Sequence, residues 1–234
     1  MKLAHLLEHS AALFPGRIAV SQYERSITYG QLWQAVEHLD RHIRDLSLPG
    51  SSRIAVLWEN SIEYAIAYFA VTRADHVLVP LDTSANPLTI NSILSDADVR
   101  VLICQSRYQR HLPKILGESS PLKHIISDRE LKVPTEGIAR HAFTEIMGDV
   151  FAYPESSGTA TAQPMTWDDS PNDLAAVFYT SGSTGAAKGV MLSHRNLVSN
   201  TLATVEYLRL TAEDSVMVIL PFYYIYGNSL LLTH

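Results

Sequence analysis

Short apolar runs alternate with longer segments of helical periodicity between residues 53 and 127, and this alternation constrains the fold more than any other feature. It predicts strands at 53–58, 77–81, 99–104 and 124–127, separated by helices at 62–73, 87–96 and 108–116. Strands that alternate with helices of this length form βαβ units with a largely parallel sheet. Right-handed crossovers place the helices on the faces of that sheet. The predicted fold class is therefore α/β, with mainly parallel βαβ sheet layers and flanking helices.

Two further helices are expected before this alternating region. Leucines repeat at helical spacing in the first residues, and Pro15 and Gly16 end that amphipathic helix. Thr28 and Gln31 fit a capping box, in which each side chain satisfies a free backbone N–H at a helix start. The helix that follows should end at Pro49.

Composition excludes several classes of protein. Hydrophobic residues make up 47% of the 234-residue chain, which supplies a sizeable core and excludes wholesale disorder. The chain has a net charge of −6, whereas nucleic-acid-binding proteins usually have an excess of basic residues, so no nucleic-acid partner is expected. The single Cys104 ends a predicted strand and is interpreted as a small core residue. The most apolar stretch, 216–232, is broken by Pro221 and Gly227, so we expect a cytoplasmic protein without a membrane span.

Residues 153–172 divide the chain, because they are rich in Pro, Ser, Thr and Gly and lack apolar periodicity. We interpret 1–152 as a first α/β subdomain, 153–172 as a connecting loop, and 173–234 as the start of a second subdomain. The second unit is predicted to contain a strand at 174–180, a glycine-rich loop, a short strand at 190–192, a helix at 194–208 capped by Ser193, and a strand at 216–220.

The glycine-rich loop carries the most informative chemistry. Glycines at 182, 185 and 189 let a backbone approach a ligand closely, and consecutive amides in such a loop can form an anion nest. Hydroxyl donors and a cation accompany them, namely Thr180, Ser181, Ser183, Thr184 and Lys188. These groups suit a polyphosphate.

Two familiar phosphate-loop patterns do not fit this segment. A Walker loop requires Gly before its Lys and Ser or Thr after it, whereas Lys188 lies between Ala187 and Gly189. The glycines also lack the Gly-x-Gly-x-x-Gly spacing of a dinucleotide fingerprint. On residue chemistry alone, a plain Ser/Gly turn between two strands remains an alternative.

The segment from Asp173 to Leu197 resembles the signature of the adenylate-forming superfamily. In it, Tyr179 is followed by TSGSTGAAKGVMLSHRNL. That superfamily includes acyl-CoA synthetases, aryl-CoA ligases, luciferases and peptide-synthetase adenylation domains. Residues 27–32, 77–82 and 221–227 resemble three further family elements in the family's order. Ala187 is a departure, since the family usually has proline there, and the loss should loosen the loop without removing a ligand.

The resemblance implies an ATP-dependent enzyme that uses Mg²⁺ to convert a carboxylic acid to acyl-AMP and pyrophosphate. Many relatives then form a thioester with coenzyme A or a phosphopantetheine carrier. By position, the nucleotide phosphates would be bound by Thr180, Ser181, Gly182, Ser183, Thr184, Gly185 and Lys188. The acid would be contacted by Tyr223, Tyr224 and Gly227, with Tyr224 where many members have histidine. A buried aromatic strand end is the alternative for 222–226. No catalytic residue is assigned.

The family's downstream magnesium-binding Glu, ribose-binding Asp and catalytic Lys have no counterpart here. We therefore expect the N-terminal portion of an adenylating enzyme, inactive alone and with apolar surface exposed. A non-catalytic nucleotide-binding or interaction module of the same fold is the alternative. His5, Glu8 and His9 match the His-x-x-Glu-His motif of some zinc proteases. Their side chains should face solvent, opposite the leucines of the same helix, so no metal site is predicted.

Overall fold

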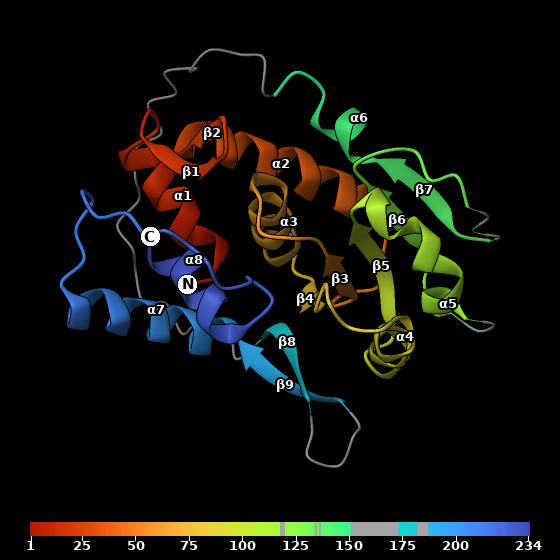
Figure 1. Ribbon diagram of the computed structural model, residues 1–234. Coiled ribbons are helices and arrows are strands. Elements are labelled where there is room, and N and C mark those ends of the chain that lie inside the picture. Colours follow the sequence, from red (N-terminus) through yellow and green to blue (C-terminus); the bar gives the residue numbers. More distant parts are fainter. Residues whose placement is uncertain (118–119, 134, 136, 151–172, 182–186) are drawn as a thin grey trace.

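A computed structural model describes residues 1–117, 120–133, 135, 137–150, 173–181 and 187–234. Within these residues, seven strands form one sheet in the order β7-β6-β5-β3-β4-β8-β9 (Figure 1). Its strands are β3 (Arg53–Leu57), β4 (Val77–Pro80), β5 (Val99–Cys104), β6 (His124–Ser127), β7 (Ala139–Ala142), β8 (Leu174–Ser181) and β9 (Ala187–Ser193). Neighbouring strands pair in parallel except β8 and β9, which pair antiparallel. The predicted α/β class with a mainly parallel sheet is confirmed.

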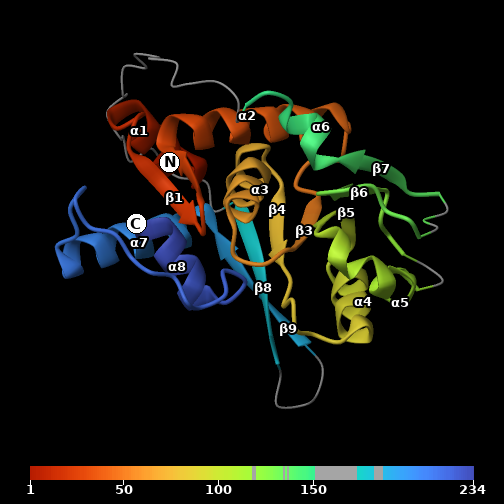
Figure 2. The same ribbon diagram turned by 45° about the horizontal axis from the view of Figure 1, so that its top comes forward.

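Helices cover both faces of this sheet (Figure 2). Their bounds are α1 (Ala4–Leu13), α2 (Tyr29–Asp45), α3 (Ile62–Arg73), α4 (Pro87–Asp96), α5 (Leu112–Leu116), α6 (Phe143–Met147), α7 (His194–Leu208) and α8 (Ile225–Thr233). Ile54 and Val56 of β3 pack with α2 and α3, whereas Ala55 and Leu57 pack with α4 and α5. Alternate strand residues therefore supply two separate cores, as a sheet buried on both faces requires.

Local signals placed several helix starts correctly. The capping box at Thr28 and Gln31 is present, with hydrogen bonds of 3.1 and 3.3 Å, and Ser193 caps α7 in the same way. Asn86 precedes the proline that opens α4 and accepts from the amide of Thr89 at 2.9 Å. These side chains satisfy amides that a helix start leaves without intrahelical partners.

Other expectations were incomplete. The helix expected at 108–116 is a 3₁₀ helix, Ser106–His111, followed by the short α5. A separate hairpin, β1 (Ile18–Gln22) with β2 (Arg25–Thr28), was not predicted, nor were β7 and α6. The long connection predicted at 153–172 lies outside the described residues, so the proposed subdomain division stays a prediction. The strands β8 and β9 extend the sheet of the preceding strands.

The strand predicted at 216–220 was wrong. This segment is irregular and pairs with no strand among the residues described, and Met217 is 85% exposed. Val218 is partly buried against the core, whereas its neighbours Met217 and Ile219 are exposed. The apolar segment 216–220 is therefore mostly exposed to solvent. A β-strand needs partners for its backbone groups, and apolar residues alone do not supply them.

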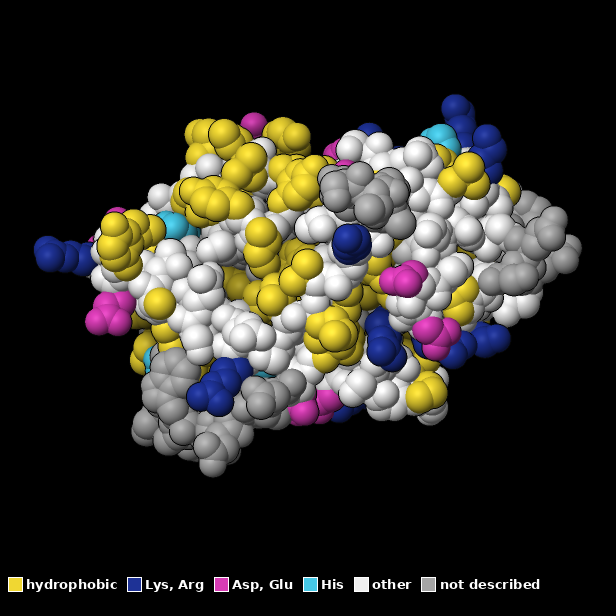
Figure 3. Space-filling model, turned by 90° about the horizontal axis from the view of Figure 1, so that it is seen from below, with side chains coloured by type: hydrophobic (Ala, Val, Ile, Leu, Met, Phe, Trp, Pro, Cys, Tyr) yellow, Lys and Arg dark blue, Asp and Glu magenta, His cyan; other side chains and the backbone are white. Residues whose placement is uncertain are grey.

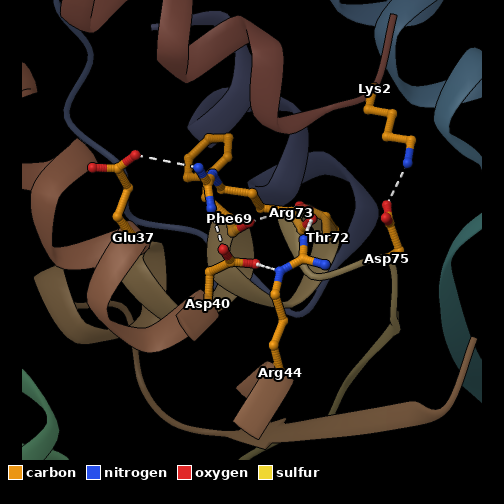
Figure 4. A network of polar contacts seen from close by, with 8 residues as sticks. All are labelled: Lys2, Glu37, Asp40, Arg44, Phe69, Thr72, Arg73 and Asp75. Atoms are coloured by element: carbon orange, nitrogen blue, oxygen red, sulfur yellow. Dashed lines mark hydrogen bonds and ion pairs between the residues drawn. The ribbon is translucent and has the colours of Figure 1, made fainter. Parts of the chain in front are cut away.

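A buried carboxylate ties α2 to α3 (Figure 4). Asp40 accepts from Arg44 at 2.9 Å and also bonds Arg73, which in turn contacts Glu37 at 3.2 Å. The Arg73 guanidinium lies 5.0 Å from the centre of the Trp33 ring. Because each carboxylate and guanidinium here has a partner, this polar cluster is interpreted as a structural tie.

Candidate functional site

The glycine-rich segment connects β8 to β9 at one edge of the sheet. Gly182, Ser183, Thr184 and Gly185 lie outside the described residues, and the structure describes Thr180, Ser181 and Lys188 at the two strand ends. Thr180 pairs directly with Lys188 across the antiparallel ladder. Side chains of directly paired residues project from the same face, so the structure brings this hydroxyl and this ammonium together.

The donor chemistry at these strand ends fits a phosphate group. Both Thr180 and Lys188 are exposed, and Lys188 forms no ion pair with any residue that the structure describes. An ammonium supplies three donors and a positive charge, and a threonine hydroxyl supplies a neutral donor. Together they can neutralise and orient an anion that bridges the two strands.

Tyr179 anchors the hairpin to α4. Its hydroxyl donates to the Asp96 carboxylate at 2.5 Å, and burial together with this hydrogen bond raises the pKa of Tyr179 well above its usual value. Its ring lies over Gly189, where an added Cβ would meet Val177 at 2.8 Å and the Tyr179 ring at 3.1 Å. Gly189 is therefore needed for close packing, a role that the loop pattern alone did not reveal.

An apolar cavity of about 340 Å³ lies beside the strand end. It is lined by Phe178, Tyr179 and Thr180 of β8 and, from the other side, by Leu220 and residues 223–226. The predicted residues Tyr223 and Tyr224 therefore share a cavity with Thr180, whereas Gly227 and Lys188 do not line it. A concave space with mostly aromatic and aliphatic walls and few polar groups is typical of a small-molecule site.

The two tyrosines of this wall differ in environment. Burial and a hydrogen bond with Asp82 raise the pKa of Tyr223 to about 12, which keeps its phenol protonated at neutral pH. Tyr224 is 52% exposed, and its ring centre lies 4.7 Å from that of Tyr223. The aromatic run is not a buried strand end: only Phe222 is buried, 5.3 Å from the Tyr64 ring, and α8 begins at Ile225.

Gly227 has a steric role. A Cβ built at this position would lie 2.1 Å from the Pro221 carbonyl oxygen and 2.7 Å from its carbon. Backbone-to-backbone approach this close is open only to glycine. Gly227 thus allows the segment before α8 to fold back against the helix, which shapes the cavity wall without lining it.

His194, which follows the loop in the sequence, is a buried structural histidine. Its Nδ1 accepts from the backbone amide of Leu3 at 3.1 Å, which joins the N-terminus to the start of α7. Burial, with a smaller contribution from Lys2, lowers the pKa of His194 to about 4, so the ring is neutral.

Cys104 is a core residue, as its sequence-based interpretation has it. Cys104 is buried, and burial raises the pKa of its thiol to about 12. No cluster of three or more potential metal ligands occurs among the residues described. His5 and Glu8 are exposed as expected, whereas His9 is half-buried. No helix in the described part of the chain is long and apolar enough to cross a membrane.

Exposed apolar surface is present, as expected. Hydrophobic side chains gather on the face shown in Figure 3. Large exposed hydrophobic residues cluster in sequence just before and at the start of α8, namely Met217, Ile219, Tyr224, Ile225 and Tyr226. Contiguous exposed apolar surface commonly marks a binding or interaction region.

Comparison with known proteins gives a family match over nearly the whole chain. The model of the family described as "AMP-binding enzyme" matches residues 7–234. Tyrocidine synthase 3 of Brevibacillus parabrevis is 30% identical over 220 residues, which are 94% of this chain and 3% of that synthase. A long-chain-fatty-acid–CoA ligase of Salmonella typhimurium is 26% identical over 241 aligned positions, covering 96% of this chain and 43% of the ligase.

Solved structures show the same fold. The anthranilate CoA ligase AuaEII, in complex with anthranoyl-AMP, superposes with a TM-score of 0.81 at 21% identity. The superposition covers 100% of this chain and 43% of the AuaEII chain. A long-chain-fatty-acid CoA ligase structure from Rhodopseudomonas palustris gives 0.79 at 22% identity, with 55% of that chain covered. The chain thus spans about half of these solved relatives and corresponds to their N-terminal portion.

Proposed function

Because the chain belongs to the AMP-binding enzyme family, we propose that the protein carrying it activates a carboxylic acid with ATP, producing acyl-AMP and pyrophosphate. The observation that carries this proposal is the position of an apolar cavity beside a cationic strand end. Thr180 belongs to both, since it lines the cavity and pairs with Lys188 across the ladder. A site with this layout can bind an acid and a polyphosphate next to one another.

We assign separate tasks to the two sides of this site. Lys188 and Thr180, with the predicted loop residues between them, would bind the β- and γ-phosphates and stabilise the departing pyrophosphate. Tyr223 and Tyr224 would contact the acid. The Tyr224 phenol can donate a hydrogen bond to a carboxylate, whereas the single O–H of Tyr223 is used by Asp82. ATP with Mg²⁺ supplies the phosphorus atom that the carboxylate attacks. The protein's contribution is therefore positioning and neutralisation of phosphate charge.

A thiol acceptor completes the proposal. Relatives of this chain include proteins named indoleacetate–CoA ligase and long-chain-fatty-acid–CoA ligase, as well as nonribosomal peptide synthetases. On this basis we propose transfer of the acyl group to coenzyme A or to a phosphopantetheine carrier. The substrate class is left at the level of a carboxylic acid.

Pyrophosphate exchange tests the proposal. The full-length protein is assayed with a panel of fatty, aryl and amino acids, and acid-dependent exchange is expected with at least one class. Lys188→Ala should lower that exchange about 10²-fold or more, because it removes a charge that faces the developing negative charge. Lys123→Ala removes an exposed lysine that lies before β6, away from the site, and should leave exchange unchanged.

The same experiment distinguishes the alternative of a non-catalytic module. ATP binding without exchange for any acid would favour the module and reject the enzyme. Equal exchange by wild type and Lys188→Ala would reject the assigned role of the lysine.

A further inference from the structure

One carboxamide holds the segment that forms the outer wall of the apolar cavity. The Asn60 Nδ2 donates to the carbonyl oxygen of Leu220 at 2.8 Å, and its Oδ1 accepts from the backbone amide of Phe222 at 2.7 Å. The two bonded peptide groups lie on either side of Pro221, which has no N–H of its own. A single side chain thus bonds both peptide groups that flank the proline, across 160 residues of sequence.

Asn60 supplies this segment with hydrogen bonds that strand pairing does not provide. The segment before Pro221 pairs with no strand among the residues described, so its backbone polar groups need other partners. The planar Asn60 carboxamide presents an N–H donor and a carbonyl oxygen acceptor side by side, which match one backbone carbonyl and one backbone amide at the same time. The Leu220 carbonyl and the Phe222 amide are therefore satisfied from outside the segment.

Asn60 is itself held in place. It follows β3 and directly precedes Ser61, whose side chain caps α3 by accepting from the amide of Tyr64 at 3.0 Å. The Asn60 carbonyl accepts from the Gln22 side chain at 3.2 Å. The carboxamide consequently projects from a rigid strand-to-helix junction rather than from a free loop.

The segment that Asn60 binds continues directly into the cavity wall. Phe222 packs on Tyr64 of α3, and the next residues, Tyr223 to Tyr226, line the cavity. A shift at Leu220 or Phe222 would move these side chains, because Tyr223 directly follows Phe222 in the chain and Tyr226 lies four residues after it.

We propose that Asn60 is a positioning residue, which fixes the aromatic wall at Tyr223–Tyr226 and thereby sets the shape of the acid pocket. The wall-fixing part stands on the hydrogen bonds alone, and the acid-pocket part rests on the function proposed above. Asn60 does not line the cavity, so it acts through the Leu220–Phe222 segment.

Hydrogen exchange on the 234-residue chain tests the wall-fixing part. Asn60→Ala removes both bonds and should speed exchange of the Phe222 amide about tenfold or more, with faster exchange across 222–226. Asn60→Asp keeps an acceptor for the Phe222 amide and loses the donor to Leu220, so Phe222 should stay more protected than in Asn60→Ala. Gln22→Ala is the matched control, because it removes a bond to the Asn60 backbone and leaves the carboxamide intact, so any change at Phe222 should be smaller than in Asn60→Ala. Unchanged exchange at Phe222 in Asn60→Ala, or an equal change in Gln22→Ala, would overturn the proposal.

Steady-state pyrophosphate exchange by the full-length protein tests the acid-pocket part. Asn60→Ala and Asn60→Asp should raise KM for the acid about tenfold and leave KM for ATP within about twofold, since the clamp acts on the acid side of the site. A parallel rise in both KM values, or no rise in either, would refute a role in acid positioning. If the wild-type protein exchanges with no acid, the proposed function fails, and the amide exchange data still decide whether Asn60 fixes the wall.

Discussion

Replacing Gly227 with alanine tests how tightly the cavity wall is folded against α8. The added Cβ would lie 2.1 Å from the Pro221 carbonyl oxygen and 3.0 Å from that of Leu220. Both neighbours are backbone atoms, so no side-chain rotation relieves the clash. Either α8 or the Leu220–Phe222 segment must move by roughly 1.4 Å to reach an ordinary contact distance.

The net cost follows from two opposing contributions. Overpacking of this kind costs about 1–3 kcal/mol, and a contact with rigid backbone belongs at the upper end. Gly227 lies within α8, so alanine recovers up to about 1 kcal/mol of helix propensity. We expect Gly227→Ala to lower the free energy of unfolding by about 2 kcal/mol and to weaken binding of apolar ligands in the cavity.

Urea unfolding of the chain, monitored by circular dichroism, measures this change. Gly50→Ala is the matched control, because a Cβ there meets nothing within 4 Å and the residue is exposed. The control should differ from wild type by less than about 0.5 kcal/mol. A Gly227→Ala protein as stable as the Gly50→Ala control would refute the steric reasoning.

Three further outcomes are expected. The pKa of His194 falls from 6.5 to about 4 on folding, so its contribution to the free energy of unfolding should be full above about pH 6.5 and decline as pH falls toward 4. Between pH 7 and pH 5 the loss should be about 2 kcal/mol. His194→Asn keeps an acceptor for the Leu3 amide and should flatten this pH dependence in urea titrations. Asp40→Ala should lower the free energy of unfolding by about 2–3 kcal/mol, because the Asp40 side chain is 5% exposed between two arginines. Glu37→Ala should lower it by less than about 1 kcal/mol, because the Glu37 side chain is 39% exposed. Equal thermal shifts for the two variants would contradict this ranking. The 234-residue chain alone should give no ATP–pyrophosphate exchange with any acid of the panel, and measurable turnover would reject the expectation drawn from the family resemblance.

Sequence reasoning succeeded where the signal is local. The bounds of α3, α4, β5 and β6 were predicted to the residue, because compact apolar runs lie between clear polar caps and turns. The capping box at Thr28 and the Ser193 cap were found for the same reason, since the donor and the acceptor lie three residues apart.

It failed where partners are distant or the composition is polar. β7 reads Ala-Arg-His-Ala and shows no apolar alternation, so only its pairing with β6 reveals it as a strand. The segment 216–220 has strand-like composition and no ladder partner in the described part of the chain. Secondary structure that depends on pairing cannot be recovered from a single segment.

The candidate site divides in the same way. The family resemblance pointed to Thr180, Lys188, Tyr223 and Tyr224 as candidates. Only the fold shows that Thr180 pairs with Lys188 and lines one cavity with both tyrosines. Asn60 escaped sequence reasoning because its partners lie 160 and 162 residues away. The nearest available signal was its position directly before the Ser61 cap at the carboxyl end of a central strand, where parallel sheets commonly place binding residues.

The most direct test of the central claim is to identify the products of ATP cleavage by the full-length protein. ATP labelled at the α-phosphate is incubated with an acid that supports exchange, and the products are separated before any thiol is added. The account predicts an acid-dependent acyl-AMP with release of pyrophosphate, both reduced about 10²-fold by Lys188→Ala. Formation of ADP and phosphate in place of AMP products, or acyl-AMP formation unaffected by Lys188→Ala, would contradict it.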